Sequence, residues 1–324
     1  MKRFRLAAEY KETLGLMLGI AVLVVIMGTN ARGFLTWFNI HNILRDFSIL
    51  LVVSSGMTVA IVLGKIDISA GTTMSLSAVI ISLMLSRGIA IPFALLGGLA
   101  SGAAVGALNG YLIGVQKVNH FIATFATSSI VRGIALVISG GTIIHANSRH
   151  IVWIGTGRIL NLFVIIWIGM LIFIGMHLLL KKTRFGYKIY STGGSEVIAE
   201  LSGLKTERVY MQSFILIGVL SAMAGLLLAG MTNSGNAIMA DGFEFNAIAI
   251  VLIGGTPFVG GRGGVIGTFA GALFIAVLRN GISMMGFGVS WQFAIIGIAI
   301  LLVVSVSTIL NERRQREETR RVWQ

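Results

Sequence analysis

The chain has 324 residues, of which 56% are hydrophobic and only 11% are charged, and its mean hydropathy is +0.91. Soluble domains carry about a quarter charged residues, so this composition excludes an ordinary soluble protein and predicts that lipid surrounds most of the chain. The net charge of +13 does not indicate a nucleic-acid surface, because the basic residues lie between apolar runs and at both ends, as in membrane proteins. The absence of cysteine excludes disulfides and thiolate sites.

Apolar runs long enough to cross a bilayer, about 20 residues each, recur along the whole chain. The first run follows the basic residues 1–11 and resembles a secretory signal in position, but Thr29-Asn30-Ala31 is a poor cleavage site, so we expect a retained helix. The chain has only 2 prolines, and its 42 glycines suit close contact between helices. We therefore predict an all-α polytopic membrane protein, a single transmembrane domain over residues 1–324. Its roughly ten spans are expected at 13–29, 45–64, 69–86, 92–115, 119–140, 161–180, 210–231, 243–256, 264–281 and 291–310.

The basic residues also predict the orientation of the chain. With ten spans, most of the 25 Lys and Arg residues fall on the side shared by the two termini, and cytoplasmic loops carry the excess of positive charge. Both termini are therefore predicted to be cytoplasmic, together with the loop 181–209 and the tail 311–324. Two alternatives remain for the tail, which either contacts anionic lipid or is solvated.

A short helix is predicted within the cytoplasmic loop 181–209. Ser195 can accept hydrogen bonds from the free amides of a following helix, Glu196 places a negative charge in its first turn, and Gly203 can end it in a left-handed conformation. This helix has only about two turns and is too short to persist alone. Two alternatives remain: the helix packs on the protein's own inner ends or the lipid surface, or it fits a cleft on a cytoplasmic partner. The predicted apolar face carries Val197, Ile198 and Leu201.

The same loop resembles a known family. Its segments Thr183–Gly186, Ile189–Ser195 and Ala199–Leu204 are similar to the coupling-helix loop of the ribose/xylose/arabinose-type ABC sugar permeases. Segments of three other regions resemble the same family, in the same order along the chain: Gly56–Val62 with Ile66–Gly71, Phe121–Thr124 with Arg132–Gly133, and Phe243–Ala249 with Val251–Thr256, Gly260–Gly263 and Gly267–Thr268. Two positions depart from the family pattern: Lys65 stands where a second glycine is usual, and Asn246 where an acidic residue is common.

The resemblance implies a type II importer fold, related to the vitamin B12 transporter, in the bacterial inner membrane. It also implies four partners: a second permease copy or a sister permease, a cytoplasmic ABC ATPase, a periplasmic or lipid-anchored solute-binding protein, and membrane lipid. The ATPase would dock at Gly193, Gly194, Ser195, Glu196, Val197, Ile198, Leu201 and Gly203. A monosaccharide is the expected solute. Autoinducer-2-type and branched-chain amino acid ABC permeases remain alternatives.

Polar residues within the apolar runs are candidates for the path of a polar solute, because sugars are held by hydroxyl and amide groups. The candidates are Asn109, Asn119, Thr124, Thr127, Ser128 and Glu244. The alternative is that they bond within the helix bundle. In the turn after the second span, Asp67 either caps the third helix or pairs with Lys65 or Arg262 in a gate.

Several other functions lack their sequence signals. The glycine-dense run 254–264 contains no glycine-lysine-serine/threonine signature, so we expect no ATP hydrolysis by this chain and a separate ATPase subunit. The five histidines show no metal-ligand spacing, and no nucleophile stands beside a base, so no metal, cofactor or catalytic residue is predicted. An ion-coupled secondary transporter is a less favoured alternative, since the acidic residues lie near the predicted helix ends.

Overall fold

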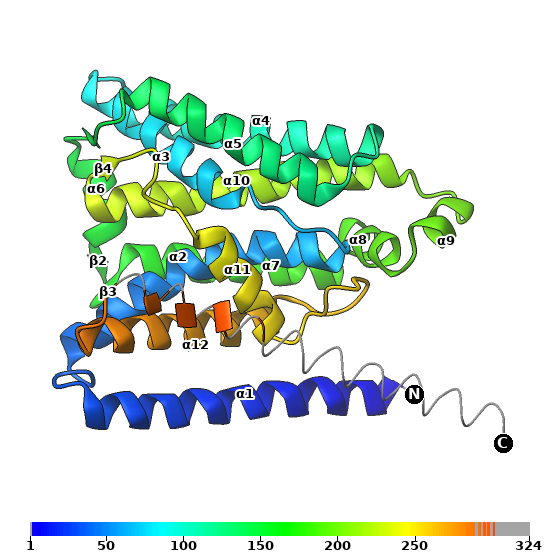
Figure 1. Ribbon diagram of the computed structural model, residues 1–324, viewed down its shortest axis with the longest axis horizontal. Coiled ribbons are helices and arrows are strands. Elements are labelled where there is room, and N and C mark those ends of the chain that lie inside the picture. The colour runs from blue at the N-terminus through cyan, green and yellow to red at the C-terminus, as the bar shows by residue number, and fades with distance from the viewer. Residues whose placement is uncertain (1, 289–290, 293, 296, 299–300, 302–324) are drawn as a thin grey trace.

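The computed structural model describes residues 2–288, 291–292, 294–295, 297–298 and 301 (Figure 1). Short antiparallel pairings join β1 (Ile144–His145) to β4 (Ser234–Gly235) and β2 (Arg158–Ile159) to β3 (Leu162–Phe163). All other regular elements of this part are helical. The α-helices are α1 (Lys2–Asn30), α2 (Trp37–Val62), α3 (Ala70–Ser86), α4 (Ile91–Gly110), α5 (His120–Ser139), α6 (Arg149–Thr156), α7 (Val164–Lys182), α8 (Arg184–Gly194), α9 (Glu196–Leu201), α10 (Thr206–Thr232), α11 (Phe243–Ile253) and α12 (Val265–Met284), and the π-helical segment η1 (Tyr111–Val115) continues α4.

The predicted all-α class is confirmed, and every predicted span that lies within the described residues coincides with a helix. Six helices are long and apolar enough to cross a membrane, and three shorter apolar ones accompany them, so the chain is a multi-pass membrane protein. The predicted span 291–310 lies largely outside the described residues, and the tail 311–324 lies wholly outside them. The count of about ten spans therefore stays a prediction.

The centre of the bundle is built from α2 and α10, which are the most buried of the long helices. Three glycines four residues apart (Gly102, Gly106 and Gly110) put one face of α4 directly against α10. A Cβ atom at any of the three would overlap the α10 backbone. Close approach of this kind replaces the hydrophobic driving force that lipid does not supply between helices.

The helix α11 is shorter than the predicted span 243–256. It has 11 residues, about 16 Å at 1.5 Å per residue, which is roughly half of a bilayer core. Its helix ends at Ile253 because the glycine-rich run that follows cannot continue it. Nearly all of the side chains of α11 are buried. This is expected, because the irregular backbone that follows α11 is tolerated at membrane depth only where protein surrounds it.

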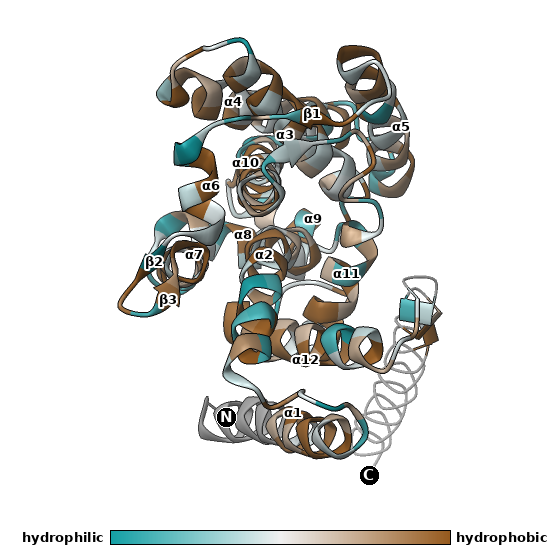
Figure 2. Cartoon of the chain, turned by 90° about the vertical axis from the view of Figure 1, so that its left-hand side faces the viewer, coloured by the Kyte–Doolittle hydropathy of each residue, from teal (hydrophilic) through white to brown (hydrophobic). Residues whose placement is uncertain are grey.

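The loops gather at two opposite ends of the bundle (Figure 1). One end, here called the inner end, holds α8, α9 and the loops 63–69, 116–119 and 254–264. The opposite end, here called the outer end, holds α6 and the short strand pairs. The view along the helices shows apolar turns on the outermost helices (Figure 2), and large apolar side chains such as Phe93, Phe125 and Val137 are exposed there, as lipid contact requires.

Two helices were not predicted from the sequence. The helix α8 lies in the predicted cytoplasmic loop and buries Gly186, Ile189 and Thr192 on one face, while α6 lies in the predicted outer loop. Both are amphipathic and shorter than a membrane span, so counting long apolar runs passed over them.

Candidate functional site

The helix α9 has the caps that the sequence predicts. The Ser195 Oγ accepts a hydrogen bond from the amide of Ile198 at 3.3 Å. At the other end, Gly203 is left-handed with φ of 82°. Its amide donates to the Glu200 carbonyl at 2.8 Å, and the Leu204 amide donates to the Ala199 carbonyl at 3.0 Å. This bond pattern is a Schellman motif. The helix has only 6 residues, and both of its ends are capped by hydrogen bonds.

The apolar face of α9 points away from the rest of the protein. Val197, Ile198 and Leu201 are 66%, 65% and 84% exposed, whereas Ala199 is buried. The structure therefore does not support packing of this face on the protein's own inner ends. Either the lipid surface or a partner protein therefore covers these three side chains.

The acidic residues of α9 hold the helix in place. Glu196 accepts hydrogen bonds from Lys117 Nζ at 2.8 Å and from the Tyr210 hydroxyl at 2.9 Å. Glu200 accepts one from Thr206 Oγ1 at 2.5 Å. Burial opposes ionisation of Glu196, but the bonds from Lys117 and Tyr210 outweigh it, and the pKa of Glu196 lies below its ordinary value. The bond to Glu196 raises the pKa of Lys117.

The two glycines before α9 lie in different surroundings, although both were predicted to contact the ATPase. A Cβ atom on Gly193 would overlap the Val62 carbonyl oxygen at the end of α2, whereas one on Gly194 would meet nothing within 4 Å. The Val62 oxygen also accepts a hydrogen bond from the Gly261 amide at 2.8 Å. The ends of α2 and α8 and the loop between α11 and α12 thus meet at one carbonyl group.

The turn between α2 and α3 is held by Asp67. Its Oδ1 accepts hydrogen bonds from the Ser69 amide at 2.8 Å and the Ser69 hydroxyl at 2.6 Å. Burial raises the pKa of Asp67, against the effect of these two bonds. The carboxylate thus binds the residue before α3 and none of the helix amides, which corrects the simple capping interpretation. Within the described residues, neither Lys65 nor Arg262 forms an ion pair with Asp67.

The other two members of the predicted gate have surroundings different from those of Asp67. Lys65 Nζ lies 5.2 Å from the centroid of the Tyr210 ring, and Arg262 is exposed. The structure does not bring the three charged residues together as a single cluster.

The predicted path residues fall into three groups. Asn109 and Ser128 join the α2–α3 turn and α3: the Asn109 amide donates to Ser69 Oγ at 2.8 Å, and Ser128 accepts from Thr72 at 3.3 Å. Two others bond within their own helix: Thr124 donates to the His120 carbonyl, and Asn119 caps α5 at the Phe121 amide. The third group consists of Thr127 and Glu244, which each keep a buried side-chain oxygen without a hydrogen-bond partner in the described part of the chain. The Asn109 Oδ1 is a further buried oxygen of this kind, although the Asn109 amide nitrogen is bonded to Ser69.

Sequence reasoning missed three residues that organise this region: Ser69, Lys117 and Tyr210. Lys117 counted only as one of the basic residues that predict the orientation of the chain, and Ser69 only as a member of the segment Ile66–Gly71 that resembles the family. Tyr210 had a usable signal, since tyrosines at the end of a span often lie at the membrane–water interface. The Lys117–Glu196 and Asn109–Ser69 bonds join residues 79 and 40 positions apart, so they could not be read from spacing.

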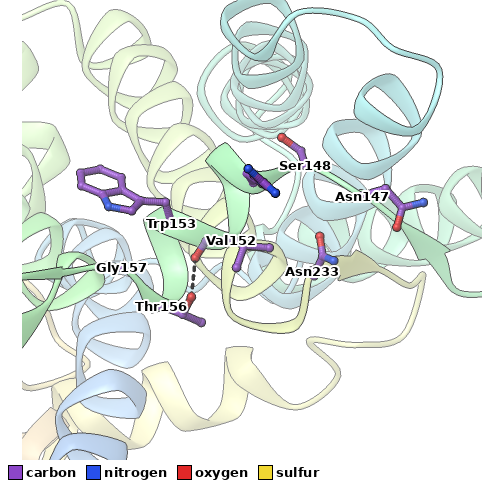
Figure 3. Close-up of a pocket in the computed structure, with 8 residues that line it drawn as sticks. Asn147, Ser148, Val152, Trp153, Thr156, Gly157 and Asn233 are labelled. Carbon is purple, nitrogen blue, oxygen red and sulfur yellow. Dashed lines mark hydrogen bonds between the residues drawn. The ribbon is translucent and has the colours of Figure 1, made fainter.

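A pocket opens at the outer end beside α6 (Figure 3). Its volume is about 370 Å³, and it is lined by Asn147, Ser148, Arg149, Val152, Trp153, Thr156, Gly157 and Asn233. In the close-up, Trp153 lies on one side, while Asn147 and Asn233 lie on the other. The Thr156 hydroxyl bonds to the Val152 carbonyl at 2.8 Å and so stays within α6. An aromatic face opposite amide groups can receive a polar surface of another molecule.

Comparison with known proteins identifies the family. A family model described as "Branched-chain amino acid transport system / permease component" matches residues 39–304. The chain belongs to this permease family. The permease is 37% identical over 295 residues to the ribose import permease protein RbsC of Bacillus subtilis strain 168, covering 90% of this chain and 92% of that one. It is 31% identical over 294 residues to the protein of the same name from Escherichia coli K12, with the same coverage.

A third relative is the L-arabinose ABC transporter permease protein AraH of Azospirillum brasilense, 28% identical over 301 residues, or 93% of this permease and 89% of the relative. No solved structure matches the chain. The resemblance to the ABC sugar permeases that was found in the sequence is thereby confirmed, and the relatives are transport components.

Proposed function

We propose that this chain is the transmembrane subunit of an ATP-binding cassette importer that carries a monosaccharide into a bacterial cell. The observation that carries the proposal is the exposed apolar face of α9 on a capped, firmly held helix. Exposed apolar patches on ordered elements mark interaction sites, and three such side chains on one short helix suit a groove on a soluble ATPase. The ATPase would hydrolyse ATP outside this chain, which itself binds no cofactor.

A sugar is the favoured solute because the relatives are named for ribose and L-arabinose. The family description names branched-chain amino acids, so that solute class, with autoinducer-2, is the alternative to test. The buried hydroxyl and amide groups around α3 support a polar solute. We assign the path to Asn109, Asn119, Thr124, Thr127, Ser128 and Glu244, and the inner gate to Lys65 and Asp67 in the α2–α3 turn and to Arg262 in the α11–α12 loop.

The arrangement supports cytoplasmic termini and an inner-membrane location. The loops that the basic residues place in the cytoplasm meet at one end, as the Lys117–Glu196 and Tyr190–Gly263 bonds show, and α1 begins at that end (Figure 1). We assign this inner end to the cytoplasm. The outer end, with α6 and its pocket, then faces a solute-binding protein, and a second permease copy or sister permease completes a type II importer.

Reconstitution tests the proposal. Proteoliposomes that hold this permease, its ATPase and its binding protein should take up labelled ribose or arabinose only when ATP and all three proteins are present. The permease alone should hydrolyse no ATP. Uptake of leucine or autoinducer-2 in place of both sugars would reassign the solute, and ionophore-sensitive uptake by this chain alone would replace the proposal with an ion-coupled transporter.

A further inference from the structure

The ring of Tyr210 joins three segments at the inner end. Its hydroxyl donates to Glu196 of α9 at 2.9 Å. The Nζ atoms of Lys65 and Lys117 lie 5.2 and 5.9 Å from the ring centroid, within the range of cation–π attraction. Lys65 belongs to the α2–α3 turn and Lys117 to the loop before α5, so one side chain of α10 connects both loops to α9.

The Tyr210 side chain is closely packed between its neighbours. Tyr210 is almost fully buried, and η1 packs against it so closely that a Cβ atom on Gly114 would lie 2.9 Å from the Tyr210 Cβ. Lys65 is only half-buried, and its charge helps to lower the pKa of Glu196. A displacement of α9 therefore acts on Lys65 in two ways, through the shared ring and through the field of the Glu196 carboxylate.

Movement of Lys65 would be passed on by the turn to which it belongs. The next residue, Ile66, donates its amide to His120 Nδ1 at the start of α5, at 3.3 Å. Asp67 then holds Ser69, which accepts a bond from Asn109 of α4. The turn is thus bonded to two further helices and cannot shift without them. If Lys65 pointed into solvent instead of contacting the Tyr210 ring, the turn would lose this side-chain link to α9.

We propose that Lys65 is a positioning residue that ties the α2–α3 turn to α9 through the Tyr210 ring, so that a shift of α9 on nucleotide binding moves the turn and the start of α3. This proposal rests on the proposed docking of an ATPase at α9. It assigns to Lys65 a role in coupling and none in contact with the solute.

The test compares Lys65→Met, which keeps the aliphatic stem and removes the charge, with Lys65→Arg, which keeps a cation for the ring. Lys188→Met removes the same charge from the exposed face of α8 and serves as the matched control. In the reconstituted complex, Lys65→Met should leave ATPase binding unchanged and lower the solute transported per ATP by about threefold, the factor appropriate to one partly exposed cation–π contact. Lys65→Arg and Lys188→Met should retain the wild-type ratio.

Hydrogen exchange separates the two ideas on which this outcome depends. In the wild type, the ATPase with nucleotide should change exchange both in α9 and at the amides of Ile66 and Ser69; in Lys65→Met, only the response in α9 should remain. If the ATPase with nucleotide changes hydrogen exchange in the wild-type α2–α3 turn but not in α9, the docking proposal is overturned. A Lys65→Met complex with an unchanged turn response and transport ratio would overturn the role of Lys65. If Lys65→Met fails to fold, Lys65→Gln takes its place with the same two outcomes.

Discussion

Leu201 offers the sharpest test of the docking face, because it is the most exposed apolar side chain of α9. It is 84% exposed in the isolated chain, so nearly all of its apolar surface is available to a partner. Changing Leu201 to Ala removes three carbon atoms, each worth about 0.8 kcal/mol when buried. Scaled by the exposed fraction, the loss is about 2 kcal/mol per docking site, roughly a thirtyfold rise in Kd. Since the side chain contacts little within the permease, its own stability should not change.

The assay is titration of detergent-purified permease with its ATPase, with thermal unfolding of the permease alone as the check on folding. Leu160 provides a matched control, because it is 82% exposed in the turn between β2 and β3 at the outer end. Leu160→Ala should leave the Kd unchanged. The reasoning is refuted if Leu201→Ala binds the ATPase as tightly as the wild type, or if Leu160→Ala weakens binding equally.

Three further outcomes test the inner end. Gly193→Ala should cost about 1–3 kcal/mol of stability, as overpacking does, and lower the Tm and transport, whereas the neighbouring Gly194→Ala, with open space at its Cβ position, should do neither. Ser69→Ala removes a hydroxyl that makes two buried hydrogen bonds and should cost about 1–3 kcal/mol, measured by thermal unfolding. The folded pKa of Glu196 lies below 4.5 and that of Lys117 above 10.5, so their contact stabilises α9 between these values. The contact is lost as the pH falls through the first pKa or rises through the second. A spin label on α9 should therefore gain mobility only outside that window, and Lys117→Gln should move the acid transition to higher pH, because only the Tyr210 bond and the charge of Lys65 then lower the pKa of Glu196.

The spans and the caps of α9 were within reach of the sequence, because each depends on neighbours along the chain. A run such as 164–182 is apolar for its whole length, and Ser195 and Gly203 are helix boundary residues by their own chemistry. The failures lie where a short element depends on distant packing. The length of α11 was missed for a different reason: the run 243–253 is apolar throughout, and the glycines that follow it end the helix earlier than the prediction of 243–256 allowed.

The site was predicted less completely for the same reason. The sequence indicated Asp67 as a helix cap or part of a gate, and Asn109 as part of a path or of bonding within the bundle, but it did not indicate that Ser69 joins the two in one hydrogen-bonded unit. A serine has no signal of its own in a chain with many small polar residues. Glu196 was interpreted as favourable for the helix dipole and as part of the ATPase-docking set, and its partner Lys117 was not foreseen because it lies 79 residues away in the sequence.

Two linkages of different stiffness connect α8 and α9 to the spans. At Gly193, the backbone of α8 contacts the Val62 carbonyl directly, and the same carbonyl accepts the hydrogen bond from Gly261. No flexible side chain lies between these backbone segments to absorb a displacement, and close-packed interiors transmit strain. At Glu196, the link runs through the long side chain of Lys117, which is half exposed and can adjust its rotamers. The backbone joint is therefore suited to carry force into α2 and the α11–α12 loop, while the charged contact orients α9 for its partner. Mutations at the two places should differ in kind: loss of the glycine contact should uncouple transport from ATP hydrolysis. By contrast, Lys117→Gln, which leaves the Tyr210–Glu196 bond in place, should weaken docking and leave the coupling ratio of the assembled complex intact.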